Sequence, residues 1–181
     1  INSICELKYD ERRSINKRSF AWFISALQTK LFGKIDLAMK YQYKNLIDDV
    51  STNDVYLSIG GDNYCYPGTD QLAAINRNIK KKGAKLVLWG CSVEPDLVEK
   101  SEIAEDLKNF DLIAAREPIS YEMLKRINEN TIKVSDPAFT LETIKLPLPD
   151  KWVEGKMVGI NASPLILQSG RSSDVVYCAY K

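Results

Sequence analysis

The sequence has no histidine among its 181 residues. Histidine is the commonest general acid or base near neutral pH, so proton transfer here has to use Asp, Glu, Lys, Tyr or Cys, or a group outside these residues. Cysteine is scarce, and none of the cysteines stands in a CxxC or other metal-binding spacing: Cys5, Cys65, Cys91 and Cys178. This pattern favours reduced thiols over a disulfide framework and predicts no required metal.

Neither charge sign dominates, and no long apolar run is present. Lys and Arg number 25 against 24 Asp and Glu, which leaves a net charge of +1. No global positive field therefore argues for a nucleic-acid partner. No apolar run approaches the roughly 20 residues that a membrane span needs. The sequence begins at Ile1 rather than Met, so a leader segment that has been removed remains an open alternative. The sequence does not indicate an oligomeric state.

The sequence does contain a repeated alternation of strand-like and helix-like segments. Apolar runs of strand length lie at residues 55–59, 85–91, 111–115 and 132–134. Amphipathic, helix-like stretches separate them: one at about residues 69–82, one that begins at Pro95 and one that begins at Ser120. Such alternation predicts right-handed βαβ units and a parallel sheet. We therefore expect an α/β, Rossmann-like parallel sheet flanked by helices, with strand 55–59 buried on both faces.

A stripe of apolar residues with helical spacing precedes this alternation of strands and helices in the sequence. Its members recur at i, i+3, i+4, i+7 and i+11 and are expected to face the core: Phe20, Phe23, Ile24, Leu27 and Leu31. A basic cluster lies just before it, made of Arg12, Arg13, Lys17 and Arg18. We interpret the cluster as a solvated face, with an anion contact as the alternative. A further helix is expected between Leu37 and Val50.

The composition changes near the carboxyl end. Pro147 and Pro149 indicate an extended linker, followed by strand-like runs at residues 156–161 and 175–180. About thirty residues after a linker cannot bury a core alone. We expect residues 1–145 to form an N-terminal Rossmann-like domain whose start is missing, and residues 146–181 to be a linker and the beginning of a truncated second α/β domain.

Polar residues follow each predicted strand. They are Gly60 to Tyr64, Gly90 to Ser92, Arg116-Glu117 and Asp136. In a parallel sheet these strand ends share one edge, where ligands bind. The glycine pair lets the chain turn sharply and lets a ligand approach bare N–H groups, although it also suits a tight turn with no ligand.

Four blocks in order carry a family resemblance: SIGGDNYCY, LWGCS, DLIAAREPISYEMLK and VSDPAFTLE. With the later VGINASPL they resemble the polysaccharide pyruvyl transferase family, from about Asp54 to Leu165. The most specific part is Arg116-Glu117-Pro118 followed by Asp136-Pro137-Ala138-Phe139.

The resemblance implies two Rossmann-like domains in a glycosyltransferase-B-like arrangement, of which this chain holds one half. It implies transfer of a pyruvyl group from phosphoenolpyruvate to hydroxyls of a cell-surface or exopolysaccharide saccharide as a ketal, with no cofactor beyond that donor. The favoured reduced thiols are typical of the cytoplasm, so a cytoplasmic location is expected. Attachment to the inner membrane face and a lipid-linked acceptor are left open. The family uses a histidine of its second domain, which this sequence lacks, so the segment is expected to be incomplete for catalysis.

Site roles follow from the resemblance together with residue chemistry. Arg116 is the candidate for the donor's phosphate or carboxylate, because a guanidinium pairs with either in two-point fashion; alternatively it only ties loops together. Gly60 and Gly61 offer backbone N–H groups to an anion or a sugar hydroxyl. Asp62 is assigned to the acceptor sugar, as base for its hydroxyl, and Asn63 also suits hydroxyl recognition.

Three assignments stay open. Tyr64 offers a stacking face to a sugar ring or packs in the core. Glu117 is either a partner of Arg116 or a general acid. Asp136 contacts substrate, or only caps its loop and orients Arg116.

Two other functions compete with pyruvyl transfer. One is a glycosyltransferase-B-like enzyme that uses a nucleotide sugar, and the other is a non-catalytic saccharide-binding module. A dinucleotide-dependent dehydrogenase is disfavoured because no GxGxxG fingerprint follows the predicted strands.

Overall fold

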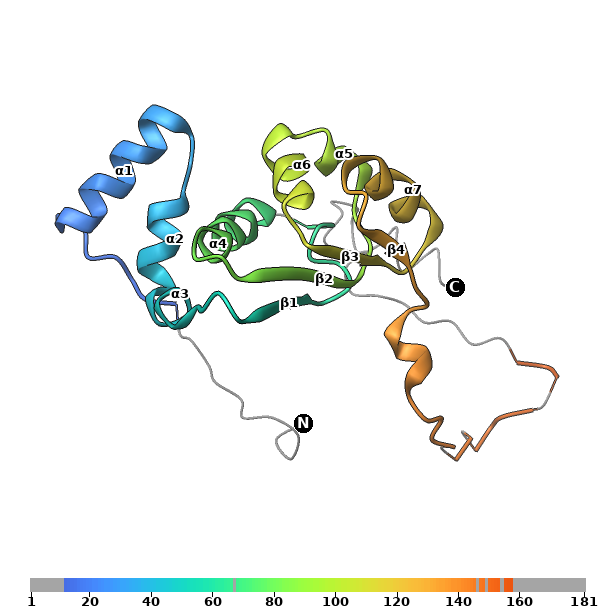
Figure 1. Ribbon diagram of the computed structural model, residues 1–181. Coiled ribbons are helices and arrows are strands. Elements are labelled where there is room, and N and C mark those ends of the chain that lie inside the picture. The colour runs from blue at the N-terminus through green and yellow to red at the C-terminus, as the bar shows by residue number, and fades with distance from the viewer. Residues whose placement is uncertain (1–11, 67, 146, 149, 154, 158–181) are drawn as a thin grey trace. The chain divides into compact units, whose positions relative to one another are not determined.

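The computed structural model describes residues 12–157, apart from residues 67, 146, 149 and 154. The chain divides into two compact units, residues 1–141 and 142–181, and every described helix and strand belongs to the first (Figure 1). The described residues of the second unit form neither helix nor strand. The strand expected at residues 175–180 lies outside the described residues, as does most of the one expected at 156–161.

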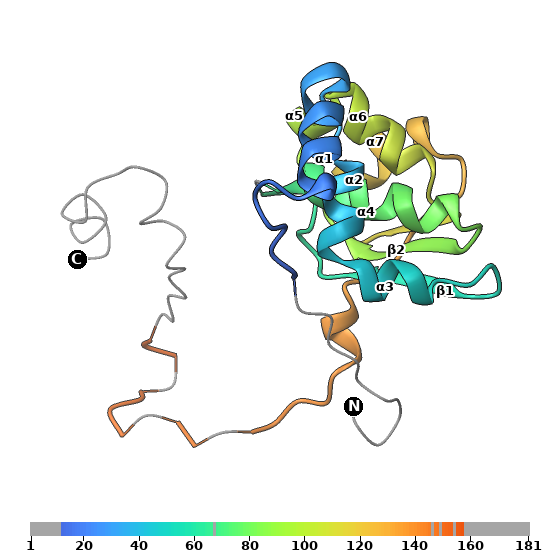
Figure 2. The same cartoon turned by 90° about the vertical axis from the view of Figure 1, so that its left-hand side faces the viewer.

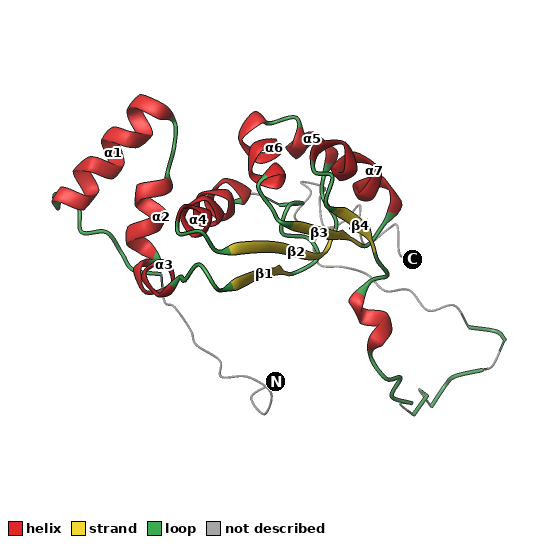
Figure 3. Ribbon diagram, viewed as in Figure 1, coloured by secondary structure: helices red, strands yellow, loops and turns green. Residues whose placement is uncertain are grey.

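The first unit contains one parallel sheet of four strands (Figure 3). The strands lie side by side in chain order: β1 (Val55–Ile59), β2 (Lys85–Cys91), β3 (Leu112–Ala115) and β4 (Thr131–Lys133). The predicted α/β class and the four strands are confirmed. Because every pair is parallel, the carboxyl ends of all four strands meet at one edge of the sheet.

The crossover helices all lie on the same face of the sheet (Figure 1). They are α4 (Thr69–Lys81), α5 (Pro95–Val98), α6 (Ser101–Lys108) and α7 (Pro118–Ile127). Crossovers of one hand between strands in chain order place helices on one face. The prediction that strand 55–59 is buried on both faces is therefore wrong: Val55, Leu57 and Ile59 are exposed on the other face.

One helix start differs from prediction for a local reason. Helix α7 begins at Pro118 rather than at Ser120, because Glu117 caps it and Pro118 takes the first helical position, where its missing N–H costs nothing. Helix α4 begins at Thr69, at the start of the expected stretch, and follows Gly68. In addition, the segment from Pro95 forms two short helices instead of one.

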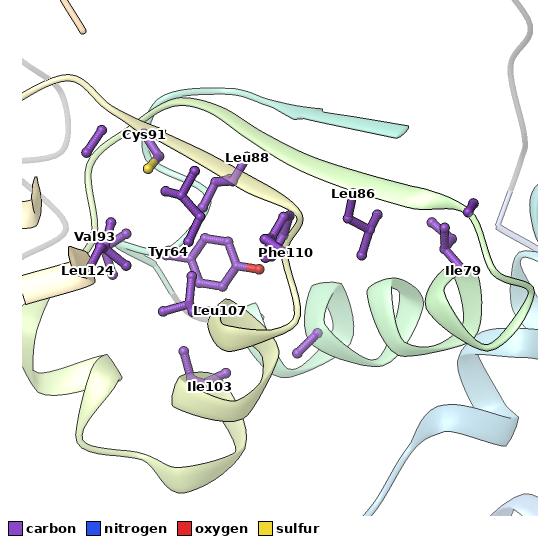
Figure 4. Packing of buried hydrophobic residues seen from close by; sticks show 14 of the residues in the cluster. Tyr64, Ile79, Leu86, Leu88, Cys91, Val93, Ile103, Leu107, Phe110 and Leu124 are labelled. Atoms are coloured by element: carbon purple, nitrogen blue, oxygen red, sulfur yellow. The ribbon is translucent and has the colours of Figure 1, made fainter. Parts of the chain in front are cut away.

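The core lies between the sheet and these helices (Figure 4). Leu86, Leu88 and Ile113 come from the strands and are fully buried. Ile103, Leu107 and Phe110 are buried against them. Burial of each such side chain contributes about 1.5–3 kcal/mol to the free energy of folding. This core therefore holds in place the edge of the sheet where the strands end.

Three helices precede the sheet: α1 (Phe20–Phe32), α2 (Asp36–Gln42) and α3 (Lys44–Asp49). A buried ion pair attaches α2 to α4, because both Nε and Nη2 of Arg77 donate to the Asp36 carboxylate at 2.9 Å. Burial alone would raise the pKa of Asp36, but hydrogen bonds and charge from Arg77 and Lys81 together outweigh it, and the net pKa is lowered.

The helix predicted over the apolar stripe is confirmed as α1, which packs on α2 (Figure 2). The prediction that the stripe lines the core is wrong. Its members Phe20, Phe23, Leu27 and Leu31 are exposed, and the buried residue of this helix is Ser25.

Candidate active site

The loops that follow the four strands meet at one side chain, that of Arg116. It stands directly after β3, where its backbone N–H donates to the Cys91 carbonyl at 3.0 Å at the end of β2. Its Nε donates to Oγ of Ser92 at 2.9 Å. The predicted convergence of strand-end residues is therefore observed in the structure.

Two carboxylates complete the set around this guanidinium. Nη1 of Arg116 donates to Oδ2 of Asp136 at 3.0 Å, and Nη2 donates to Oδ1 of Asp62 at 2.5 Å. The three side chains come from the loops after β1, β3 and β4. We refer to Asp62, Ser92, Arg116 and Asp136 as the strand-end cluster.

The glycine pair makes this cluster possible. A Cβ on Gly61 would lie 2.5 Å from Cζ of Arg116 and closer still to Nη1, so only glycine allows the guanidinium this near the backbone. Gly60 has a φ of +116°, which L side chains rarely adopt. The space that a side chain at position 61 would fill is thus occupied by Arg116. Gly61 also accepts a backbone hydrogen bond from Ser92 at 2.6 Å.

Asn63 closes the turn after β1. Its Nδ2 donates to Oγ of Ser58 at 3.2 Å and to the carbonyl of Ile59 at 3.0 Å. Its Oδ1 lies against Gly60, where an added Cβ would be 2.9 Å away. The amide therefore holds the loop that presents Asp62, and its N–H groups point to protein rather than outward.

A second glycine contact fixes the loop after β4. Gly90 has a φ of +64°, and a Cβ there would lie 2.9 Å from Cγ of Pro137. Asp136 caps the 3₁₀ turn η1 (Pro137–Thr140), since its Oδ1 accepts from the N–H of Ala138 at 2.8 Å. Asp136 thus both caps its loop and orients Arg116, as one of its predicted roles required.

Glu117 has a different partner from those expected. Its Oε1 accepts from the Ser120 N–H at 2.7 Å and its Oε2 from the Ile119 N–H at 2.8 Å. Partial burial raises the pKa of Glu117, but hydrogen bonds from Ser120 and Ile119 and the charge of Arg116 outweigh it, so the net pKa is lowered. An ionised helix cap is a poor general acid at neutral pH, and the hydrogen-bond geometry directs the carboxylate to α7 instead of Arg116.

Tyr64 does not face the site: of its two predicted roles, packing in the core is confirmed and sugar stacking is wrong. Its ring is 0% exposed and packs edge-on against Phe110, with ring centroids 6.4 Å apart (Figure 4). Its hydroxyl donates to Oδ2 of Asp106 at 2.5 Å and accepts from Nδ2 of Asn76 at 3.0 Å. Burial and the neighbouring Asp106 raise the pKa of Tyr64 well above its usual value.

Ser92 belongs to the cluster although sequence reasoning gave it no role of its own. It fixes Nε of Arg116, while Cys65 donates to its carbonyl at a sulfur–oxygen distance of 3.4 Å. The feature of the sequence that could have identified Ser92 is its position directly after strand β2. Two carboxylates, of Asp62 and Asp136, surround the single guanidinium of Arg116, so acidic groups outnumber basic ones in the strand-end cluster.

Across the described part of residues 12–157, no group of three or more His, Cys, Asp or Glu could hold a metal ion. No described helix is long and apolar enough to cross a membrane.

The four-strand parallel sheet with helices along its face and a polar cluster at its carboxyl edge defines a Rossmann-like α/β protein. A family model described as polysaccharide pyruvyl transferase matches residues 6–176. The chain belongs to the polysaccharide pyruvyl transferase family. No curated protein and no solved structure gives a match.

Proposed function

We propose that this chain takes part in transferring a pyruvyl group from phosphoenolpyruvate to saccharide hydroxyls, and that the strand-end cluster is where donor and acceptor meet. The observation that supports it most is the fixed guanidinium of Arg116. Three partners hold it, so its orientation is set before any substrate binds. A fixed, planar cation suits the phosphate or the carboxylate of the donor.

Two carboxylates already occupy this guanidinium, and a polyanionic donor next to both would be repelled. Donor binding therefore requires one carboxylate to move away. Asp62 is the better candidate, because its side chain is 46% exposed against 34% for that of Asp136. Asp136 also accepts a second hydrogen bond, from Ala138, which keeps it in place.

This exchange gives Asp62 a role in the reaction. When the donor takes Nη2 of Arg116, the Asp62 carboxylate is released beside the bound donor. Once it no longer binds Arg116, this carboxylate can accept the proton of the acceptor hydroxyl that attacks the donor.

The bond changes balance as follows. C3 of phosphoenolpyruvate gains a proton and becomes a methyl group, which leaves C2 cationic. A sugar hydroxyl forms a C–O bond to C2 and gives its proton to Asp62. The C2–O bond to phosphate then breaks, phosphate leaves as the second hydroxyl adds to C2, and the proton of that hydroxyl passes to phosphate. Because Glu117 is held ionised on α7, the acid that protonates C3 is assigned to a group outside the strand-end cluster.

The decisive experiment is mass spectrometry of candidate saccharides incubated with the complete protein and phosphoenolpyruvate. The proposal expects a mass gain of one pyruvate less one water, together with release of inorganic phosphate. A parallel incubation with UDP-sugars tests the glycosyltransferase alternative. Transfer of a sugar with no response to phosphoenolpyruvate would overturn the proposal, and reaction with neither donor by folded protein would favour a saccharide-binding module.

A further inference from the structure

Helix α1 packs against α2 through its polar side. Ser25 is 6% exposed, and its hydroxyl donates to the carbonyl of Ala21 at 2.7 Å. Oε1 of Gln28 accepts from the N–H of Leu37 at 2.9 Å, which ties α1 to the first turn of α2. In a helix on the surface of a soluble protein the apolar side normally makes this contact.

The apolar side of α1 faces outward instead. Phe20 is 78% exposed, Phe23 is 60% exposed and Leu31 is 62% exposed. With Leu27 they recur at i, i+3, i+7 and i+11, so they form one continuous stripe along the helix. Figure 1 shows α2 between α1 and α4, so this stripe lies at the margin of the described first unit. Exposed apolar stripes of this kind mark interaction surfaces.

The segment around the stripe carries charge of one sign. Residues 12–35 contain no Asp or Glu and six basic residues: Arg12, Arg13, Lys17, Arg18, Lys30 and Lys34. The whole chain has a net charge of only +1, so this concentration is local. Within the described residues, the salt bridges involve none of the six. Arg12 and Arg13 donate hydrogen bonds to Gln42 and Asn45, whose side chains are neutral, so these contacts do not cancel the positive charge.

We propose that α1 and its flanking basic residues dock this protein on a membrane surface that contains anionic phospholipid. Phe20, Phe23, Leu27 and Leu31 would enter the boundary between head groups and acyl chains, and Lys and Arg would contact the phosphates. With 13 residues the helix lies in the interface and does not span the bilayer.

Charge also argues against the simplest other occupant of the stripe, a second copy of this chain. Pairing two α1 stripes would bring two segments of six basic residues and no acidic residue together. Such like charges repel each other, whereas an anionic lipid surface attracts both. Docking on lipid does not depend on the pyruvyl-transfer proposal.

The test is co-sedimentation of the full chain with vesicles. One set is phosphatidylcholine with about a third phosphatidylglycerol, and the other is pure phosphatidylcholine. We expect binding to the anionic vesicles, weaker by about tenfold or more on the neutral ones. The double variant Phe23→Ser/Leu31→Ser should lower binding to anionic vesicles by about tenfold or more, since it removes two inserted side chains.

A matched control changes two apolar residues elsewhere that are even more exposed than Phe23 and Leu31. Ile119 is 69% exposed and Phe139 is 86% exposed, and Ile119→Ser/Phe139→Ser should leave vesicle binding unchanged. Because all four positions are exposed, circular dichroism should show the same fold in both double variants. Equal loss in both would mean a general effect of apolar surface and would contradict docking through α1.

A second pair of variants tests whether the basic residues attract the protein to anionic lipid. Lys17→Gln/Lys30→Gln/Lys34→Gln should weaken binding to anionic vesicles by about tenfold or more, and Lys100→Gln/Lys108→Gln/Arg126→Gln should not. Three further outcomes would overturn the proposal. The first is no vesicle binding by the unaltered protein, and the second is equal binding to neutral and anionic vesicles. The third is that the unaltered protein binds no vesicles but forms a dimer in light scattering, which Phe23→Ser/Leu31→Ser converts to a monomer.

Discussion

Gly61 and the guanidinium of Arg116 lie in direct contact at the carboxyl edge of the sheet. A Cβ at position 61 would be 2.5 Å from Cζ and 2.8 Å from Nη2, both too close for any real Cβ. The glycine after β1 is therefore explained by the arginine after β3. This contact, together with the hydrogen bonds to Asp62 and Asp136, joins three strand-end loops through one side chain.

Gly61→Ala should displace the Arg116 side chain. We expect it to cost about 1–3 kcal/mol of unfolding free energy, the usual cost of forcing a methyl group into an occupied space. Chemical denaturation measures this cost. In an Arg116→Ala background the methyl group has room, so the same substitution should cost much less. Equal costs in both backgrounds would show that the contact does not constrain position 61.

Asp62 and Asp136 both bind Arg116, yet their substitutions should differ. Asp62→Asn should lower kcat by about a hundredfold or more by removing the base, without raising KM for phosphoenolpyruvate, because a competitor for Arg116 is weakened. Asp136→Asn should raise KM, because it loosens Arg116 and the cap on Ala138. Steady-state kinetics separates these effects, with the exposed Asp70→Asn as control. A raised KM with unchanged kcat in Asp62→Asn would refute the exchange of partners.

Glu117→Gln distinguishes a helix cap from a catalytic acid. A glutamine carries one acceptor oxygen and no charge, so we expect a loss of about 0.5–2 kcal/mol of unfolding free energy. Because the pKa of Glu117 is lowered by folding, its contribution to stability is present above pH 4.5 and is lost as pH falls through the lower folded value. Activity per folded molecule should stay within about a factor of ten of the unaltered enzyme, whereas loss of a general acid costs about a hundredfold or more.

Asp106 should make stability depend on pH in the opposite direction. Burial raises the pKa of Asp106 above 3.8, and hydrogen bonds from Tyr64 and Asn76 only partly oppose this. Between pH 3.8 and the raised value the folded state holds a proton that the unfolded state has lost, so this contribution to stability falls as pH rises through that window.

Asp106→Asn removes that titration and keeps an acceptor oxygen for Tyr64. Thermal unfolding of both proteins across a pH series should show the variant gaining relative to the unaltered protein as pH rises from about 4. A constant difference in melting temperature across the series would show that Asp106 does not titrate in this way.

The sequence predicted the strands and the meeting of polar loops, but not how the loops interlock. Apolar runs ending in glycine located β1 and β2, and chain-order parallel pairing then placed Gly61, Ser92 and Arg116 at one edge. The hydrogen bonds from Arg116 to Asp62, Ser92 and Asp136 depend on side-chain directions across four loops, which no local pattern encodes.

Two errors share one physical cause. Periodicity identifies which residues share a face, but it does not reveal what covers that face. The stripe of Phe20 and Phe23 was assigned to the core on helical spacing alone, and Val55 was assigned to a doubly covered strand. Tyr64 stands among polar residues in the sequence, which left both sugar stacking and core packing open. The buried acceptor Asp106, 42 residues away in sequence, explains why the hydroxyl of Tyr64 can be buried.

The most direct test of the account is isothermal titration of phosphoenolpyruvate into the complete protein and into its Arg116→Gln variant, with Arg126→Gln as control. The account predicts saturable binding to the unaltered protein and to the control, and binding weaker by about tenfold or more in Arg116→Gln, the loss expected for a charged hydrogen bond. A folded Arg116→Gln protein that binds phosphoenolpyruvate as tightly as the unaltered one would contradict it.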